Sequence, residues 1–248
     1  MIAIELSVDT IDAALAADTL DVQRIELCSA GALGGLTPGP GLLETAIARC
    51  HRVAVHPLIR PRAGGFHYTP AEIDVLLADI AAAVDAGAAG VVVGALTEHH
   101  EVDKTVLTDL VAAAQGHEVT FHRAIDISRD PLLAMERLIE SGVHRVLSSG
   151  HAARAEDGAS TLAEMVRIAQ GQLTVMACGG IRANNVHAIL AATGVTHLHG
   201  APRTPARPDI LDGAVSATEF GAQPQFDLAG ARALIAAVRN PPTPTLDD

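Results

Sequence analysis

The 248-residue sequence contains no tryptophan, one tyrosine and four phenylalanines, so aromatic residues contribute little to any core. Hydrophobic residues still make up 49% of the chain, and they are mainly Ala, Val, Leu and Ile. At this length they suffice to bury a sizeable core. Lysine and arginine together number 17 against 29 aspartates and glutamates, which gives a formal net charge of −12. Such a charge repels nucleic acid and anionic membrane surfaces, so we expect neither as a partner.

Cysteine is also scarce. The three cysteines, Cys28, Cys50 and Cys178, form no CxxC pair, which indicates reduced thiols rather than a disulfide framework. The sequence has no apolar run of membrane-spanning length and no signal-peptide pattern at its N-terminus. We therefore expect a cytoplasmic protein.

Short apolar runs alternate with helical segments along most of the chain. The expected strands cover residues 2–8, 22–28, 53–60, 89–94, 118–123, 145–149, 173–178 and 196–199. The expected helices cover residues 11–17, 42–50, 70–86, a segment from 103, 131–141, 161–171, 184–192 and 227–239. Thr69-Pro70-Ala71-Glu72 predicts a capping box at the start of the third helix. This alternation predicts an α/β protein with a (β/α)8 TIM barrel. An open doubly wound sheet is the alternative, but it has no reason to stop at eight strands.

Residues 202–226 interrupt the alternation with prolines and glycines and are too long for an ordinary strand–helix connection. We expect an extended C-terminal arm within a single barrel domain of residues 1–240, followed by a disordered tail at 241–248. The arm carries Ile210, Leu211, Val215 and Phe220, apolar residues that a disordered linker seldom has. It is therefore expected to pack on the barrel or on a neighbouring subunit of a homo-oligomer.

Ionisable residues stand at the carboxyl ends of the expected strands, where barrel enzymes do their chemistry. The candidates for catalysis are Glu5, Glu26, Arg60, Arg62, His122 and Asp126. The acids and His122 can move a proton, and the arginine pair can stabilise a developing oxyanion or carboxylate. A structural alternative pairs the two glutamates with the two arginines inside the barrel, which leaves His122 and Asp126 without a role.

A second group of residues predicts an anion site at the same rim. Gly179-Gly180 follows the seventh strand and opens a helix, so its backbone N–H groups can hold an anion. Ser149 and Gly150 follow the sixth strand, and Arg203 follows the eighth and supplies a counter-charge. The expected ligand is phosphate, sulfate or a substrate carboxylate. The structural alternative is a tight turn that needs positive φ.

A metal site is a third reading of the rim. Glu26, His122, Asp126 and His199 can hold a divalent ion, although His197-x-His199 is the only tight spacing. Cysteine sulfur suits copper(I), so Cys28, His122 and His199 are the candidate copper ligands. The competing reading of each cysteine is an ordinary buried thiol.

Several motifs together resemble the CutC family. They are Arg24-Ile25-Glu26-Leu27-Cys28-Ser29, Gly34-Gly35-Leu36-Thr37-Pro38, Ile59-Arg60-Pro61-Arg62-Ala63-Gly64-Gly65-Phe66, Thr120-Phe121-His122-Arg123-Ala124-Ile125-Asp126, Leu147-Ser148-Ser149-Gly150 and Gly179-Gly180. The similarity runs in order over about residues 2–203. It implies a cytoplasmic (β/α)8 barrel assigned to copper homeostasis. Two positions depart from the family pattern: Ala201-Pro202 replaces a Ser-Ala pair, and Cys178 replaces a small residue.

Two functions follow from these observations. The resemblance implies a copper homeostasis protein whose ligand is a copper ion. The chemistry of the rim favours an enzyme that acts by acid/base or metal-assisted chemistry on a small substrate bearing a phosphate or carboxylate. The cysteines and methionines are too scattered for the clustered soft ligands of a copper carrier. An oligomeric scaffold, the third class, would not need a charged mouth.

Overall fold

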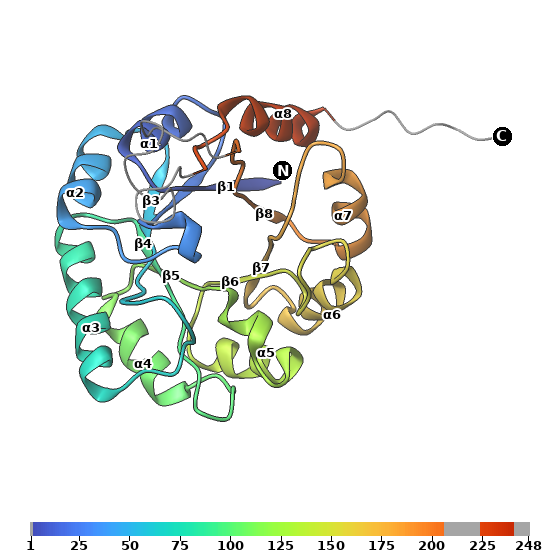
Figure 1. The fold of residues 1–248 in the computed structure, drawn as a ribbon. Helices are drawn as coiled ribbons and strands as arrows, with labels where there is room; N and C mark the ends of the chain where they lie inside the picture. The colour runs from blue at the N-terminus through green and yellow to red at the C-terminus, as the bar shows by residue number, and fades with distance from the viewer. Residues whose placement is uncertain (1, 206–223, 241–248) are drawn as a thin grey trace, which may run out of the picture.

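The computed structural model describes residues 2–205 and 224–240. Eight parallel strands form one sheet in the order β3-β2-β1-β8-β7-β6-β5-β4. The strands are β1 (Ala3–Val8), β2 (Arg24–Leu27), β3 (Ala54–Pro57), β4 (Gly90–Val93), β5 (Glu118–Phe121), β6 (Arg145–Ser148), β7 (Thr174–Ala177) and β8 (His197–Gly200). The end strands β3 and β4 meet through a Leu58–Val92 bridge and an Ile59 N–H bond of 2.8 Å to the Val92 carbonyl. The sheet therefore closes into a barrel, as Figure 1 shows.

The helices lie around the outside of the barrel (Figure 1). They are α1 (Ile11–Asp18), α2 (Pro40–Arg49), α3 (Pro70–Asp85), α4 (Lys104–Ala113), α5 (Pro131–Glu140), α6 (Ala159–Ala169), α7 (Val186–Thr193) and α8 (Leu228–Arg239). Two short 3₁₀ helices, η1 (Gly31–Leu33) and η2 (Arg123–Ile127), follow β2 and β5 and were not expected from the sequence. The predicted (β/α)8 TIM barrel is confirmed. Among the described helices, none combines the length and the apolar character needed to cross a membrane.

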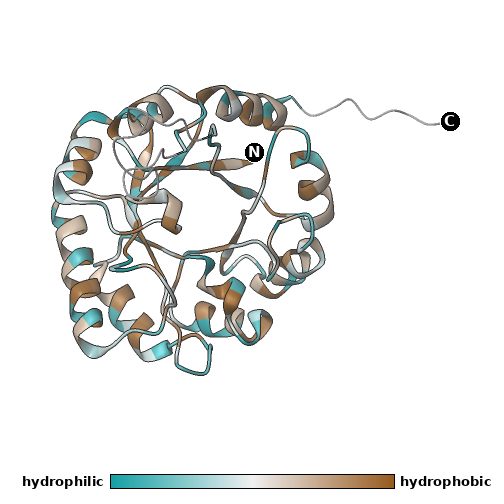
Figure 2. Ribbon diagram, in the orientation of Figure 1, coloured by the Kyte–Doolittle hydropathy of each residue, from teal (hydrophilic) through white to brown (hydrophobic). Residues whose placement is uncertain are grey.

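The hydrophobic core lies between the sheet and the helices. Each helix carries both hydrophobic and hydrophilic residues, as Figure 2 shows. Strand residues such as Ile4, Leu6 and Phe121 are fully buried in this core. Side chains alternate along a strand, so the intervening residues, such as Glu5, point into the barrel. The barrel interior is consequently rich in buried charged and polar groups, including Arg24, Glu26, His56, Arg145 and His199.

The predicted helix limits agree with the structure to within two residues at each end where both were given. Seven of the strands are shorter than predicted; the expected strand 53–60, for example, ends at Pro57. The eighth has the predicted length and is shifted by one residue, from 196–199 to His197–Gly200. Residues 206–223, with the four apolar residues of the predicted arm, and the predicted tail at 241–248 lie outside the described residues. The two described ends of the arm meet, since the Thr204 N–H bonds the Gln225 carbonyl at 2.8 Å. The homo-oligomer stays a prediction.

The β3–α3 loop is fixed by the predicted capping box, which is confirmed. The Thr69 side chain accepts the Glu72 N–H at 3.3 Å, and the Glu72 carboxylate accepts the Thr69 N–H at 2.8 Å. Glu72 also binds Arg62, so the cap ties the loop to the start of α3.

Replacing Thr69 with alanine should lower the free energy of unfolding by about 1 kcal/mol, because a helix N–H group loses its acceptor. Urea unfolding measures this change. Thr108→Ala is the matched control: this exposed hydroxyl bonds only the Lys104 carbonyl within α4, so its loss leaves no helix N–H unpaired. Equal destabilisation by the two substitutions would contradict the role of the cap.

Candidate functional site

A cavity of about 270 Å³ lies at the carboxyl ends of the strands. Its charged and titratable lining residues come from β2, β8 and the segments that follow β3, β5 and β8. They are Glu26, Arg60, His122, Arg123, His199 and Arg203. The remaining lining residues are Ser7, Cys28, Gly31, Gly34, Gly35, Leu58, Phe66, Leu147 and Ala201. The cavity thus lies where barrel enzymes bind their substrates.

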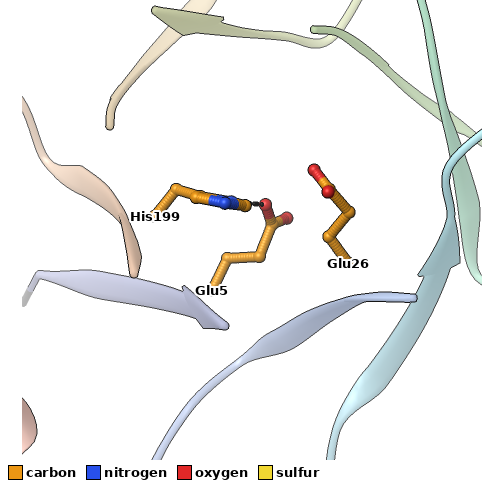
Figure 3. Close-up of side chains that lie close together, drawn as sticks. All are labelled: Glu5, Glu26 and His199. Atoms are coloured by element: carbon orange, nitrogen blue, oxygen red, sulfur yellow. Dashed lines mark hydrogen bonds and ion pairs between the residues drawn. The ribbon is translucent and has the colours of Figure 1, made fainter. Parts of the chain in front are cut away.

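Glu5 lies beneath this cavity and is completely buried. The parallel register places it beside Arg24 on β2 and beside His199 on β8. One carboxylate oxygen binds Arg24 Nε at 3.1 Å, and the other lies 2.7 Å from His199 Nδ1. Figure 3 shows the imidazole pointing at Glu5, with Glu26 approaching from the far side. The register of three neighbouring strands therefore assembles the cluster.

The three groups of this cluster have displaced pKa values. Burial alone would raise the pKa of Glu5, but the hydrogen bond with His199 and the charges of His199, Arg24 and His56 outweigh it and lower that pKa to about 2. Burial opposes protonation of His199, yet the negative charges of Glu26 and Glu5 raise its pKa. Glu5 is therefore a permanent carboxylate that favours a proton on its neighbour.

Glu26 differs from Glu5 because no arginine of the described residues forms an ion pair with it. Burial raises the pKa of Glu26, the charge of His199 lowers it, and the charge of Glu5 raises it again. The net effect is a raised pKa. Glu26 and His199 thus compete for one proton next to the cavity, and the pair titrates as a unit. A carboxyl group in this position can take a proton from a ligand and return it.

His122 enters the cavity from the end of β5. Its Nδ1 accepts the Ala124 N–H at 3.1 Å, so the ring proton is on Nε2. The ring packs against Phe66 at a centroid distance of 4.6 Å, and a Cβ at Gly94 would overlap it. Burial, followed by the charge of Arg60, lowers the pKa of His122 to about 3. The imidazole is consequently neutral at physiological pH.

Arg60 fastens two loops over the cavity. Its guanidinium donates to the carbonyls of Leu33 at 3.0 Å, Gly35 at 2.9 Å and Gly64 at 2.8 Å. It also lies over the Phe66 ring at 5.1 Å. All of these partners are uncharged, and Arg60 lines the cavity without an ion-pair partner among the described residues.

Arg62, two residues later, was predicted to join this site, and the structure does not bring it there. Arg62 forms an ion pair with Glu72 on α3 and donates to the carbonyls of Gly65 at 2.9 Å and His67 at 2.8 Å. It lies over Tyr68 on the outer side of the loop, with 39% of its side chain exposed. Its role is therefore to shape the loop.

Asp126 also takes a place that differs from the predicted one. Its carboxylate accepts from Arg123 Nε at 2.7 Å, the Ser148 hydroxyl at 2.6 Å and the Ser149 N–H at 3.0 Å. The Gly150 N–H bonds the Ser148 hydroxyl at 2.9 Å. The backbone donors predicted to hold an external anion at Ser149 and Gly150 thus have partners within the chain. Asp126 acts as the internal anion of this turn and orients Arg123.

The Gly179-Gly180 turn lies apart from the residues that line the cavity. Both glycines have positive φ, +90° and +73°, which L side chains rarely adopt. Helix α7 begins only at Val186, so the turn does not sit at its first residues. Arg203, the third part of the predicted anion site, does line the cavity; it donates to the Ser7 carbonyl at 2.9 Å and lies 3.6 Å from Asp9. Of the predicted anion site, Arg203 therefore lines the cavity and the two glycines do not.

The model of the CutC family matches residues 2–204. The chain belongs to the CutC family. A CutC family protein from Glaesserella parasuis serovar 5 (strain SH0165) is 40% identical over 222 residues, which cover 90% of each chain. The copper homeostasis protein cutC homolog of Homo sapiens is 40% identical over 200 residues, 81% of this chain and 73% of the human one. A CutC crystal structure from Streptococcus agalactiae matches with a TM-score of 0.76 at 30% identity, over 81% of this chain and 98% of that one.

The CutC family assignment raises the question of copper ligands. Burial, then the charges of Glu26 and Asp9, raises the pKa of the Cys28 thiol to about 12. Burial likewise raises the pKa of Cys178 well above its usual value. Copper(I) favours clustered soft ligands, and among the described residues neither thiol belongs to a cluster of metal-capable side chains. Within the described residues, the metal-capable atoms that lie within 4.8 Å of one another belong to Glu5, Glu26 and His199.

Sequence reasoning missed several residues of the site. Ser7 is two residues beyond Glu5, and Arg24 is two residues before Glu26, so strand alternation alone places each on the inner face. Phe66 comes from the β3–α3 loop, and no pattern in the sequence connects it with His122. Gly94 is likewise recognised only when the ring it accommodates is seen.

The buried His122 predicts a pH-dependent stability. An unfolded histidine titrates near pH 6.5 and the folded one at about 3, so only the unfolded chain binds this proton between those values. The free energy of unfolding therefore falls as the pH drops through this window. In His122→Gln it should fall less between pH 7.5 and 5, as measured by urea unfolding at both pH values.

The exposed His67 provides the matched control, since His67→Gln should keep the pH dependence of the parent. A parent and a His122→Gln variant with the same pH dependence would show that the folded imidazole binds its proton as readily as the unfolded one.

Proposed function

We propose that this CutC family member is a cytoplasmic enzyme that transfers a proton within a small anionic substrate. The observation that carries the proposal is Glu26, a buried carboxyl group with a raised pKa that lines a cavity shared with His199 and three arginines. A raised pKa brings the affinity of a carboxylate for protons closer to neutral pH, where a general base works best.

The arginines support an anionic substrate. Arg60 and Arg203 line the cavity, and their closest partners are backbone carbonyls, with Asp9 at 3.6 Å from Arg203. Arg123 is balanced by Asp126 at 2.7 Å but still reaches the cavity. Arginine recognises carboxylate and phosphate groups through paired hydrogen bonds. The cavity thus combines a proton-transfer group with three arginines, of which Arg60 has no ion-pair partner among the described residues.

A Schiff-base mechanism needs a lysine at the cavity, and the chain has a single lysine. Lys104 stands at the start of α4 and pairs with Glu140 at 2.6 Å. No lysine amine is therefore available at the cavity to form a Schiff base with a carbonyl substrate. Direct proton abstraction by a carboxylate remains as the reaction that these residues can perform.

Copper homeostasis is the assignment of the family, and copper binding by this chain is the second candidate function. Family membership favours it, whereas neither Cys28 nor Cys178 belongs to a cluster of metal-capable side chains among the described residues. The Glu5, Glu26 and His199 cluster offers hard or borderline ligands, but both oxygens of Glu5 already accept hydrogen bonds from Arg24 and His199. The proton-transfer reading therefore accounts for more of the site.

Proton transfer can be tested by hydrogen exchange in D₂O. The protein is incubated with small phosphorylated and carboxylated aldehydes and ketones, and the loss of C–H signals beside the carbonyl is followed by ¹H NMR. We expect exchange for at least one compound and a loss of about 10²-fold or more in Glu26→Gln. The exposed Glu44 on α2 provides the control Glu44→Gln, which should keep the parent rate.

Exchange that is undiminished in Glu26→Gln would remove Glu26 from the chemistry. A parent protein that exchanges no member of the panel would count against proton transfer itself and would favour the copper-binding candidate.

A further inference from the structure

We propose that the Nε2–H of His122 donates a hydrogen bond to the carbonyl oxygen of the substrate, so the substrate is a small anionic aldehyde or ketone that passes through an enol or enolate. This inference rests on the proposed function and deepens it. Proton transfer alone names no substrate class, whereas a buried donor without a partner, in a residue that shares a cavity with a base, indicates one.

The tautomer of His122 comes from its hydrogen bonds. The Ala124 N–H points at Nδ1 at 3.1 Å, which leaves Nδ1 as an acceptor and puts the single ring proton on Nε2. Nε2 is buried and has no hydrogen-bond partner among the described residues, although the ring lines the cavity. A buried donor without a protein partner costs free energy unless a ligand or solvent supplies an acceptor. The geometry therefore calls for an oxygen opposite Nε2.

The ring itself is held in place on two sides. Phe66 packs on it at a centroid distance of 4.6 Å, and Gly94 leaves just the room that the imidazole fills. The Arg60 guanidinium carbon lies 5.1 Å from the centroid of the Phe66 ring, and the charge of Arg60 opposes protonation of His122. A fixed donor needs no reorganisation when charge develops on the oxygen, which is the condition for electrostatic stabilisation of a transition state.

The charge of each hydrogen-bond donor indicates which substrate group it binds. The arginines of the cavity provide the positive charge that a phosphate or carboxylate needs, whereas His122 offers one uncharged N–H. Such a donor suits a carbonyl oxygen that gains negative charge during the reaction. The cavity of about 270 Å³ is smaller than the ~300–1,000 Å³ of usual ligand pockets, so the substrate is small.

The step balances without a further reactant. Glu26 takes the proton from the carbon beside the carbonyl, the C–H electron pair becomes the C=C bond, and the carbonyl π pair moves to the oxygen that His122 bonds. Returning the proton to the same carbon gives exchange or epimerisation. In a hydroxycarbonyl compound, returning it to the neighbouring carbon, while the hydroxyl proton moves to the former carbonyl oxygen, gives an isomer. Nothing is oxidised or reduced overall.

The test compares a planar with a tetrahedral ligand in each of two anionic classes. Phosphoglycolohydroxamate presents a planar, enediolate-like oxygen, and glycerol 3-phosphate presents a tetrahedral carbon in its place; oxalate and glycolate form the corresponding carboxylate pair. Affinities are measured by calorimetry for the parent, His122→Phe and His122→Gln. We expect one planar ligand to bind the parent at least tenfold more tightly than its tetrahedral partner, and His122→Phe to lose that preference.

His122→Gln keeps an N–H donor and should retain part of the preference, which separates donation from simple packing. In ¹⁵N-histidine-labelled protein, the Nε2–H signal that is missing from His122→Gln should move downfield when the planar ligand binds. Where a compound undergoes exchange, His122→Phe should slow it by about 10²-fold, the effect of removing one donor to a developing oxyanion. Urea unfolding verifies that each variant folds.

The outcomes are distinguishable. Glu26-dependent exchange together with an unchanged preference in His122→Phe would overturn the role of His122 and leave the proposed function standing. A Nε2–H signal that does not respond to a bound planar ligand would overturn it equally. A parent protein that binds neither ligand of either pair would overturn the carbonyl assignment and the proposed function together.

Discussion

The pairing of Glu5 with Arg24 and His199 is the interaction on which the barrel mouth depends. A carboxylate that is fully buried costs several kcal/mol unless charged partners compensate for it. Those partners lie on the two neighbouring strands, at the register positions directly opposite Glu5. The closed parallel sheet therefore provides the compensation, and Glu5 in return joins three segments that are far apart in the chain.

This pairing influences the protonation of the two titratable groups beside it, His199 and Glu26. The charge of Glu5 favours a proton on His199, and the two together set the protonation of Glu26. On the opposite side of the mouth, Arg60 and burial keep His122 neutral. One site thus holds a carboxyl group with a raised pKa and an imidazole with a lowered one, because their neighbours differ in sign. Groups pushed in opposite directions mark acid/base sites.

The CutC family name suggests copper, and the chemistry of this mouth points elsewhere. A copper(I) carrier needs thiolates that meet, whereas Cys28 borders the cavity and Cys178 packs with Leu147 and Met176. Three arginines beside the cavity would also oppose a cation. A small anion agrees with both observations.

The sequence by itself determined the barrel, since eight strand–helix repeats and a capping box at Thr69 are local patterns that follow from backbone geometry. It also determined that Glu26, Arg60, His122 and Arg203 would end at the mouth, because strand ends share one rim. Only the tertiary structure decided which of the predicted rim residues line the cavity. Arg62 and Asp126 also follow strands and carry charged side chains, but neither lines the cavity. Arg62 pairs with Glu72 and Asp126 pairs with Arg123. Local patterns fix the alternation of side chains on a strand, but the direction of a side chain in a loop depends on contacts with residues far along the chain.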